Sequence, residues 1–185
     1  MTSSSELAVF AFLPGDTHAV PAGLLTLTEQ ENALTASSFV YGLKYIKRPK
    51  AFDIDPVGLA FHNRPDAIGA VLFPPAEMVL FGGIRDAAPD AWGRRVIEKK
   101  FKVPANSLPE SSYLLEAGAN RVGALDIRVE LSSPSSTGGA GDIKRLEYLL
   151  AAADAIEAGD PIPANLADIF DAGSSLGVCG RKRQW

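Results

Sequence analysis

The sequence has almost none of the residues that form covalent or metal crosslinks. Its 185 residues include one cysteine, Cys179, and two histidines, His18 and His62. A single cysteine excludes an internal disulfide framework and a thiolate zinc site, and neither histidine has a partner at metal-ligand spacing. We therefore expect no metal site, and we expect a reducing, cytoplasmic location.

Long apolar runs and export signals are also absent. The longest apolar run near the start, Leu7 to Leu13, is far shorter than the ~20 residues of a transmembrane helix. The segment from Met1 to Glu6 has no basic residue that could begin a signal peptide. We expect a protein that is neither membrane-spanning nor exported.

Neither sign of charge dominates the composition. Eighteen basic and 22 acidic residues give a formal net charge of −4. This charge argues against generic binding to nucleic acid or anionic lipid, although it leaves room for a local basic patch. With 46% hydrophobic residues, the chain is typical of a globular protein that buries a core without crosslinks.

The residue pattern predicts an α+β fold that begins with β structure. Apolar, aromatic and β-branched residues predict strands at Leu7 to Leu13, Val20 to Thr28 and Ser37 to Tyr41. We expect these strands to form a small antiparallel sheet or partial barrel. Residues 47–75 are rich in Pro and Gly and are interpreted as loops that join short strands.

A helix is predicted near residues 87–101. Its expected apolar face consists of residues that recur at helical spacing, namely Trp92, Val96, Ile97 and Phe101. Asp86 is the expected N-cap and Pro104 the expected end.

Further elements are predicted beyond residue 105. They are a short helix from Ser111 to Ala117, a half-buried strand near residues 123–131, and helices near residues 142–158 and 164–172. The Ser/Gly-rich segment Ser132 to Gly141 is interpreted as a flexible connector.

The segment from Asp86 to Arg95 brings carboxylates, an aromatic ring and guanidinium groups to one helix start. Such a group can bind an anion or position an acid, but structural roles explain it more simply. Asp86 and Asp90 lie where the helix dipole favours negative charge. Trp92 falls on the apolar face, and Gly93 lets another backbone approach closely.

The stretch Gly173-Ser174-Ser175-Leu176-Gly177 is the local pattern best suited to a phosphate group. Its small residues would let backbone N–H groups approach anionic oxygens. It matches neither a Walker A loop nor the Gly-x-Gly-x-x-Gly spacing. By itself it is interpreted as a loop that ends a helix and begins a tail.

Five short segments occur in one order along the chain: Phe39-Val-Tyr-Gly-Leu-Lys-Tyr45, Ile54-Asp-Pro56, Asp86-Ala-Ala-Pro-Asp-Ala-Trp-Gly-Arg94, Arg121-Val-Gly-Ala-Leu125 and Gly173-Ser-Ser-Leu-Gly177. Together they resemble the N-terminal portion of the HipA family of toxin kinases. The most specific element is the string Asp-Ala-x-Pro-Asp-x-Trp-Gly-Arg, whose defining residues here are Asp86, Pro89, Asp90, Trp92, Gly93 and Arg94.

This resemblance implies part of a two-lobed serine/threonine protein kinase. Residues 1–105 would form its β-rich N-terminal subdomain, residues 106–177 part of the kinase N-lobe, and residues 178–185 an aberrant basic tail. The resemblance also implies that Gly173 to Gly177 begin the glycine-rich loop over ATP, and that Ser175 is an autophosphorylated serine. Kinases of this family pair with a HipB-like DNA-binding antitoxin, and characterised members phosphorylate aminoacyl-tRNA synthetases.

The chain departs from the family pattern inside that loop. The family continues Gly-Gly-Ala-Arg-Pro-Lys, whereas this sequence continues Val178-Cys-Gly-Arg-Lys-Arg-Gln-Trp185. Because the family places its catalytic and Mg²⁺-binding residues further on, we expect a truncated kinase portion that is inactive alone, with no cofactor of its own and an uncovered face able to form a homodimer. The alternative is a stand-alone module that binds and restrains a separately encoded HipA-like kinase core.

Overall fold

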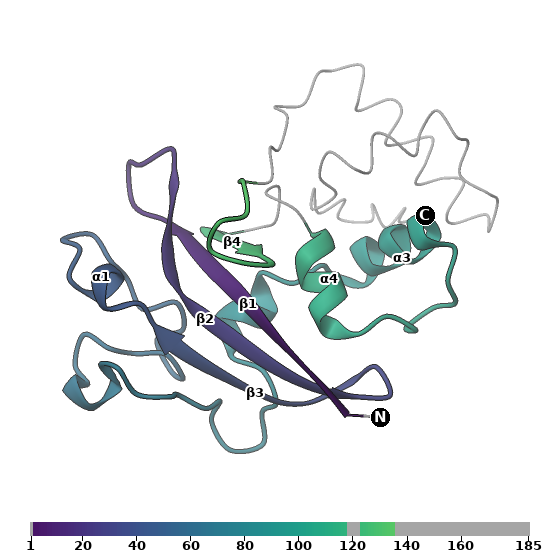
Figure 1. Cartoon of the computed structure of the whole chain (residues 1–185), viewed down its shortest axis with the longest axis horizontal. Helices are drawn as coiled ribbons and strands as arrows, with labels where there is room; N and C mark the ends of the chain where they lie inside the picture. Colours follow the sequence, from purple (N-terminus) through teal and green to yellow (C-terminus); the bar gives the residue numbers. More distant parts are fainter. Residues whose placement is uncertain (1, 118–122, 136–185) are drawn as a thin grey trace, which may run out of the picture.

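The computed structural model describes residues 2–117 and 123–135, and it has an α+β fold (Figure 1). Its sheet is antiparallel and has four strands in the order β3-β2-β1-β4. The strands are β1 (Thr2–Phe12), β2 (Ala19–Gln30), β3 (Ala33–Tyr41) and β4 (Leu125–Arg128). The expected antiparallel sheet is thereby confirmed.

The first three strands form a meander because short turns connect them. Between β2 and β3, Gln30 pairs with Ala33, so Glu31 and Asn32 form a two-residue turn. Both turn residues have positive φ, 51° and 69°, and turns of this hand match the twist of neighbouring strands. Strand β3 therefore begins at Ala33, four residues before the expected Ser37.

Strand β4 returns to the sheet from far along the chain. It lies beside β1, where Leu125 pairs with Ala11 and Arg128 pairs with Ala8. Residues on both sides of the boundary expected at residue 105 therefore share one sheet. The strand expected near 123–131 is shorter than predicted, and Val129 and Leu131 are exposed beyond its end.

The segment between β3 and the last helices is mostly loop. It contains α1 (Leu43–Ile46), the 3₁₀ turn η1 (Pro65–Ala67) and α2 (Gly82–Asp86). The short strands expected within residues 47–75 are represented by a single bridge, in which Leu72 exchanges backbone hydrogen bonds with Phe39.

Helix α3 (Ala91–Phe101) begins later than the helix expected near 87–101. Asp86 is the last residue of α2, and Asp90 is the N-cap, since its carboxylate accepts a hydrogen bond from Gly93 N–H at 2.8 Å. The helix ends at Phe101, and its C-cap residue Lys102 has a left-handed φ of 55°. The N-cap expected at Asp86 was therefore wrong by four residues, whereas the helix end expected near residue 101, before Pro104, is confirmed.

The buried face of α3 also differs from the expected one. Val96 and Ile97 are buried as predicted, but Trp92 is half-buried and Phe101 is 45% exposed. Gly93 and Glu98 complete the buried set. Helix α4 (Glu110–Glu116) follows and contacts both α3 and β4. Figure 1 shows α3 and α4 together on one side of the molecule.

The core lies against one face of the sheet. The inward residues alternate along the strands, as in Leu25 and Leu27 of β2. Aromatic residues from β3, α1 and the loops fill the space beneath them: Phe39, Tyr41, Tyr45, Phe61 and Phe81. None of the helices in the described ranges has the length and apolar character needed to cross a bilayer.

Several predicted features lie outside the described residues. They are the helices near 142–158 and 164–172, the glycine-rich segment from Gly173 to Gly177 with Ser175, and the tail 178–185. They remain predictions.

Candidate functional site

The family-like string from Asp86 to Arg94 forms the junction between α2 and α3. Pro89 is buried directly before the helix, and Gly93 is buried in its first turn. Asp86 is exposed, and its Oδ1 lies 3.7 Å from Arg85 Nε. Asp90, in contrast, caps α3. The structure thus brings these residues together as a capped helix start, and most of their polar groups are used within it.

Arg94 connects this helix start to α4. Its guanidinium donates to Glu110 Oε1 at 2.7 Å and to the Pro89 carbonyl at 3.3 Å. The guanidinium carbon also lies 4.4 Å from the centre of the Tyr113 ring, a favourable cation–π distance. Because carboxylate, carbonyl and ring surround it, this guanidinium links α3 with α4.

Tyr113 and Glu98 form a buried polar contact beside Arg94. The Tyr113 hydroxyl donates to Glu98 Oε1 at 2.5 Å, and Asn106 N–H donates to the same oxygen at 2.6 Å. Burial, together with the neighbouring Glu98 carboxylate, raises the pKa of Tyr113 to about 12. Arg94, Glu98, Glu110 and Tyr113 together are called the α3–α4 network.

The carboxylate of Glu29 connects α4 to the sheet. Glu29, on the inward face of β2, is buried and accepts hydrogen bonds from the Ser111 N–H and hydroxyl. Pro109, the N-cap residue of α4, makes no side-chain cap. Glu29 therefore supplies an acceptor that the helix start itself lacks.

Asp55 holds the loop after β3 against α2. Its Oδ1 accepts from the N–H groups of Val57 and Gly58, and its Oδ2 accepts from Gly82 N–H at 2.7 Å. The side chain is 4% exposed. Gly83 lets this loop approach closely, since a Cβ there would lie 2.0 Å from the Ile54 carbonyl oxygen.

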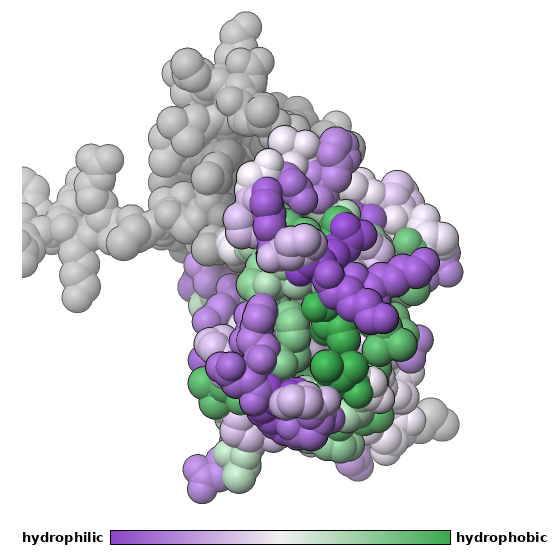
Figure 2. Space-filling model, turned by 90° about the vertical axis from the view of Figure 1, so that its left-hand side faces the viewer, coloured by the Kyte–Doolittle hydropathy of each residue, from purple (hydrophilic) through white to green (hydrophobic). Residues whose placement is uncertain are grey.

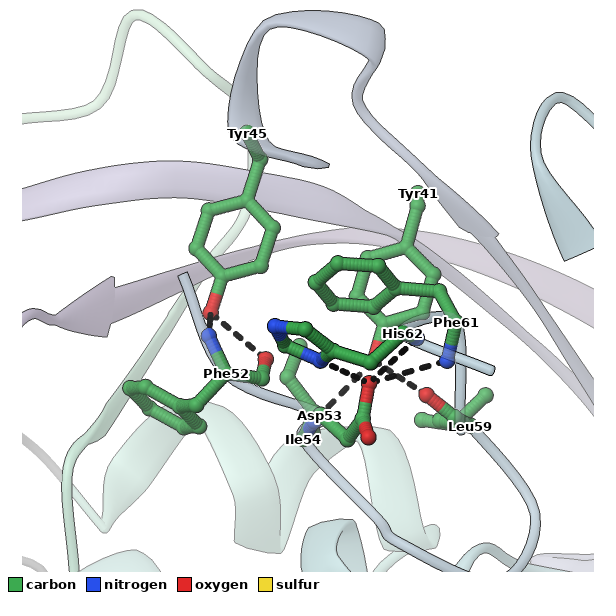
Figure 3. Close-up of polar contacts among 8 residues, drawn as sticks. All are labelled: Tyr41, Tyr45, Phe52, Asp53, Ile54, Leu59, Phe61 and His62. Atoms are coloured by element: carbon green, nitrogen blue, oxygen red, sulfur yellow. Dashed lines mark hydrogen bonds and ion pairs between the residues drawn. The ribbon is translucent and has the colours of Figure 1, made fainter. Parts of the chain in front are cut away.

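The neighbouring Asp53 is hydrogen-bonded to His62, a pairing of carboxylate and imidazole that also occurs in catalytic sites. Its Oδ1 accepts from Phe61 N–H at 2.8 Å and from His62 Nδ1 at 2.9 Å (Figure 3). A carboxylate only accepts, so His62 Nδ1 carries the proton. Burial opposes ionisation of Asp53, but the hydrogen bonds from Phe61 and His62 lower its pKa below the ordinary value.

Two tyrosines near this pair form hydrogen bonds to the backbone of the surrounding loop. The Tyr41 hydroxyl donates to the Leu59 carbonyl at 2.6 Å and accepts from Ile54 N–H (Figure 3). The Tyr45 hydroxyl does the same with the carbonyl and N–H of Phe52. Burial raises the pKa of both tyrosines. The tyrosine hydroxyls thus satisfy backbone N–H and carbonyl groups of the loop, which in a strand would pair with a neighbouring strand.

An aspartate that orients a histidine is the arrangement of a general base, but it needs a group to deprotonate. His62 is half-exposed and stacks on the Phe61 ring at 4.3 Å. No described serine, threonine or cysteine is hydrogen-bonded to this imidazole. Within the part of the chain that the structure describes, no group of three His, Cys, Asp or Glu is placed to hold a metal ion.

Sequence reasoning missed the four buried carboxylates of the described residues, Glu29, Asp55, Glu98 and Asp126, and it missed the Asp53–His62 pair. A signal for Glu29 was present, because it continues the alternation of Leu25 and Leu27 and so falls on the buried face. No spacing rule indicates Asp53 and His62, which meet only because the loop between them folds back.

Comparison of the chain with protein-family models, with curated proteins and with solved structures gave no match. The function proposed below therefore rests on the residues and their geometry.

Proposed function

We propose that the described residues belong to the N-terminal part of a HipA-like serine/threonine kinase, and that this part is a structural support without phosphoryl-transfer activity of its own. The observation that carries the proposal is that residues of the family-like string, Asp86 to Arg94, make structural contacts within the chain. Asp90 caps α3 and Arg94 joins α3 to α4. Residues of the string thus hold helices together.

The environment of the buried carboxylates supports the same proposal. Phosphoryl transfer needs carboxylates that face a metal ion or the attacking hydroxyl. Here Glu29, Asp55 and Glu98 each accept two or more hydrogen bonds from N–H or O–H groups of the chain itself. Their lone pairs are engaged in stabilising the fold.

A kinase assay tests this proposal. The purified full chain is incubated with radiolabelled ATP and Mg²⁺, with and without a generic protein acceptor. We expect transfer at background level, both to the acceptor and to the chain. Labelling of the chain that disappears in the Ser175→Ala variant would contradict the proposal, because it would place an active phosphoryl-transfer site in this polypeptide.

A second function is favoured by one observation, the exposed apolar side chains of the loop segment. Six large ones lie between β3 and α2: Leu43, Val57, Ile68, Val71, Phe73 and Val79. Exposed apolar surface of this kind is typical of interaction sites. We propose as the alternative a module that binds and restrains a separately encoded HipA-like kinase core.

Co-expression distinguishes the two functions. A tagged chain is expressed with a HipA-like kinase core that lacks its own N-terminal subdomain, and growth and co-purification are measured. The module predicts co-purification and relief of toxicity, both weakened by Val57→Ser with Phe73→Ser. Phe101→Ser, at an exposed apolar residue of α3, is the matched control. Co-purification with an added HipB-like antitoxin tests the proposed antitoxin contact. Light scattering of the chain alone tests the proposed homodimer.

A further inference from the structure

The segment from the start of β3 to Phe52 carries positive charge only. Residues 33–52 contain four cations and no aspartate or glutamate, although the whole chain has a net charge of −4. The cations are Lys44, Lys47, Arg48 and Lys50, and all four are exposed. They lie on α1 and the turn after it, and are called the α1 basic surface.

These cations are not neutralised by the described part of the protein. Lys44, Lys47 and Arg48 form no ion pair with any other described residue. Lys50 donates to the Pro14 carbonyl, which is an uncharged partner. The turn that Lys50 contacts carries Asp16, but the two side chains form no ion pair. Their positive charge is therefore available to a partner.

The α1 basic surface has a rigid base. Tyr45, in the middle of α1, is fully buried and stacks on Tyr41 with ring centres 5.9 Å apart. Its hydroxyl is hydrogen-bonded to both backbone groups of Phe52. Lys44 adjoins Tyr45 in the sequence, and Lys47, Arg48 and Lys50 lie between Tyr45 and Phe52, so both ends of this basic stretch are fixed. A partner would then pay little ordering entropy on the side of this protein.

Apolar surface adjoins the cations. Leu43 is 56% exposed and lies one helical turn before Lys47, the C-cap residue of α1, so the two side chains are neighbours. The side of the molecule that carries α1 in Figure 1 faces the viewer in Figure 2, where hydrophilic surface borders an apolar area. A partner that fits this side must offer both negative charge and an apolar side chain.

We infer that the α1 basic surface binds an acidic peptide segment that also carries apolar side chains. Charge complementarity supplies the attraction, and Leu43 supplies an apolar contact. A duplex or a bilayer extends well beyond four cations and would meet the acidic remainder of the chain, which repels it. A short peptide touches only the local surface. This inference does not depend on the proposed kinase relationship.

The test uses the full chain and a fluorescent peptide of about twelve residues that repeats Asp-Glu-Leu. Fluorescence anisotropy gives its Kd for the wild type, for Lys44→Gln with Lys47→Gln and Arg48→Gln, and for a control. The control is Arg95→Gln with Lys99→Gln and Lys102→Gln, which removes the same charge from exposed residues of α3 and its C-cap. Circular dichroism confirms that each variant is folded.

We expect the α1 variant to raise Kd about 10-fold, since three exposed ionic contacts are lost. The α3 control should change Kd less than about 2-fold, because it alters only the long-range field. A peptide with Asn-Gln-Leu repeats should bind much more weakly. Leu43→Ser should weaken binding of the acidic peptide as well.

Three results would overturn the inference. One is an equal loss of affinity in the α1 and α3 variants, which would indicate unspecific attraction. Another is the absence of measurable binding by the wild type at low ionic strength. The third is tighter binding of a single-stranded oligothymidine, or of vesicles containing phosphatidylserine, than of the acidic peptide.

Discussion

Glu29 and Ser111 are 82 positions apart in the sequence, and the Glu29 carboxylate accepts two hydrogen bonds from Ser111, from the N–H at 3.0 Å and from the hydroxyl at 2.7 Å. Both residues are buried. The contact fixes the first turn of α4 to the end of β2, so Glu29 helps to position the α3–α4 network.

Replacement of Glu29 tests this dependence. Glu29→Ala leaves two buried donors of Ser111 without a partner, and we expect the free energy of unfolding to fall by about 3 kcal/mol. Glu29→Gln keeps one acceptor and should cost about 1 kcal/mol. Urea unfolding measures both values. Glu6→Ala, at an exposed strand residue, is the control and should change stability by less than about 0.5 kcal/mol. Equal stability of all variants would show that the contact contributes nothing.

The raised pKa of Tyr113 predicts a loss of stability at high pH. The folded pKa is about 12, above the ordinary value near 10. Between these values the unfolded chain releases the phenolic proton and the folded chain keeps it, so stability falls as pH rises. Below the ordinary pKa the contribution is fully present. Each such tyrosine contributes a slope of about −1.4 kcal/mol per pH unit.

Tyr113→Phe removes one of these protons. Tyr41 and Tyr45 keep theirs, since burial raises the pKa of both. We therefore expect a shallower alkaline fall in urea unfolding above about pH 10, together with lower stability at neutral pH because Glu98 loses a donor. An unchanged alkaline slope in the variant would contradict the assignment.

The Asp53–His62 pair predicts the opposite dependence at acid pH. The folded pKa of Asp53 lies below its ordinary value, so its contribution is present above that ordinary value, near 4, and is lost as pH falls through the folded pKa. Asp53→Asn should flatten the acid limb of the stability profile and cost about 1 kcal/mol at neutral pH. Asp16→Asn, at an exposed turn residue, is the control. A steeper acid limb in Asp53→Asn would reverse the sign and refute the prediction.

The start of α3 is capped by Asp90 and not by Asp86. Asp90 caps the helix through Gly93 N–H at 2.8 Å, whereas Asp86 is exposed and ends α2. Asp90→Ala should lower the free energy of unfolding by about 1 kcal/mol. Asp86→Ala should have an effect below about 0.5 kcal/mol. Thermal unfolding of the two variants decides between the caps, and a larger loss in Asp86→Ala would restore the cap expected from the sequence.

Periodicity predicted the regular elements well because their signals are local. The alternation of Leu25 and Leu27 identified β2, and Val96 and Ile97 identified the buried face of α3. Boundaries were harder, since both Asp86 and Asp90 are suitable caps and only the packing of α2 decides between them. The start of β3 was missed because Glu31 and Asn32 give no strong turn signal without a glycine.

The polar contacts of the candidate site were largely inaccessible to sequence reasoning. Asp53 meets His62, and Glu98 meets Tyr113, only after loops and helices have packed. Such pairs follow from tertiary structure, and no spacing rule indicates them. The structural interpretation of the string from Asp86 to Arg94 stays a prediction, and the partner of Arg94 on α4, Glu110, was not foreseen.

The pairing of β4 with β1 bears on how the chain folds. The strands β1, β2 and β3 are joined by short turns and can form early, but β1 keeps one edge open until Leu125 reaches Ala11. Closing so long a loop carries a large entropic cost and is slow. During synthesis, the β1 edge therefore stays unpaired until almost the whole described chain has left the ribosome. In this interval the unpaired edge can pair with a wrong strand.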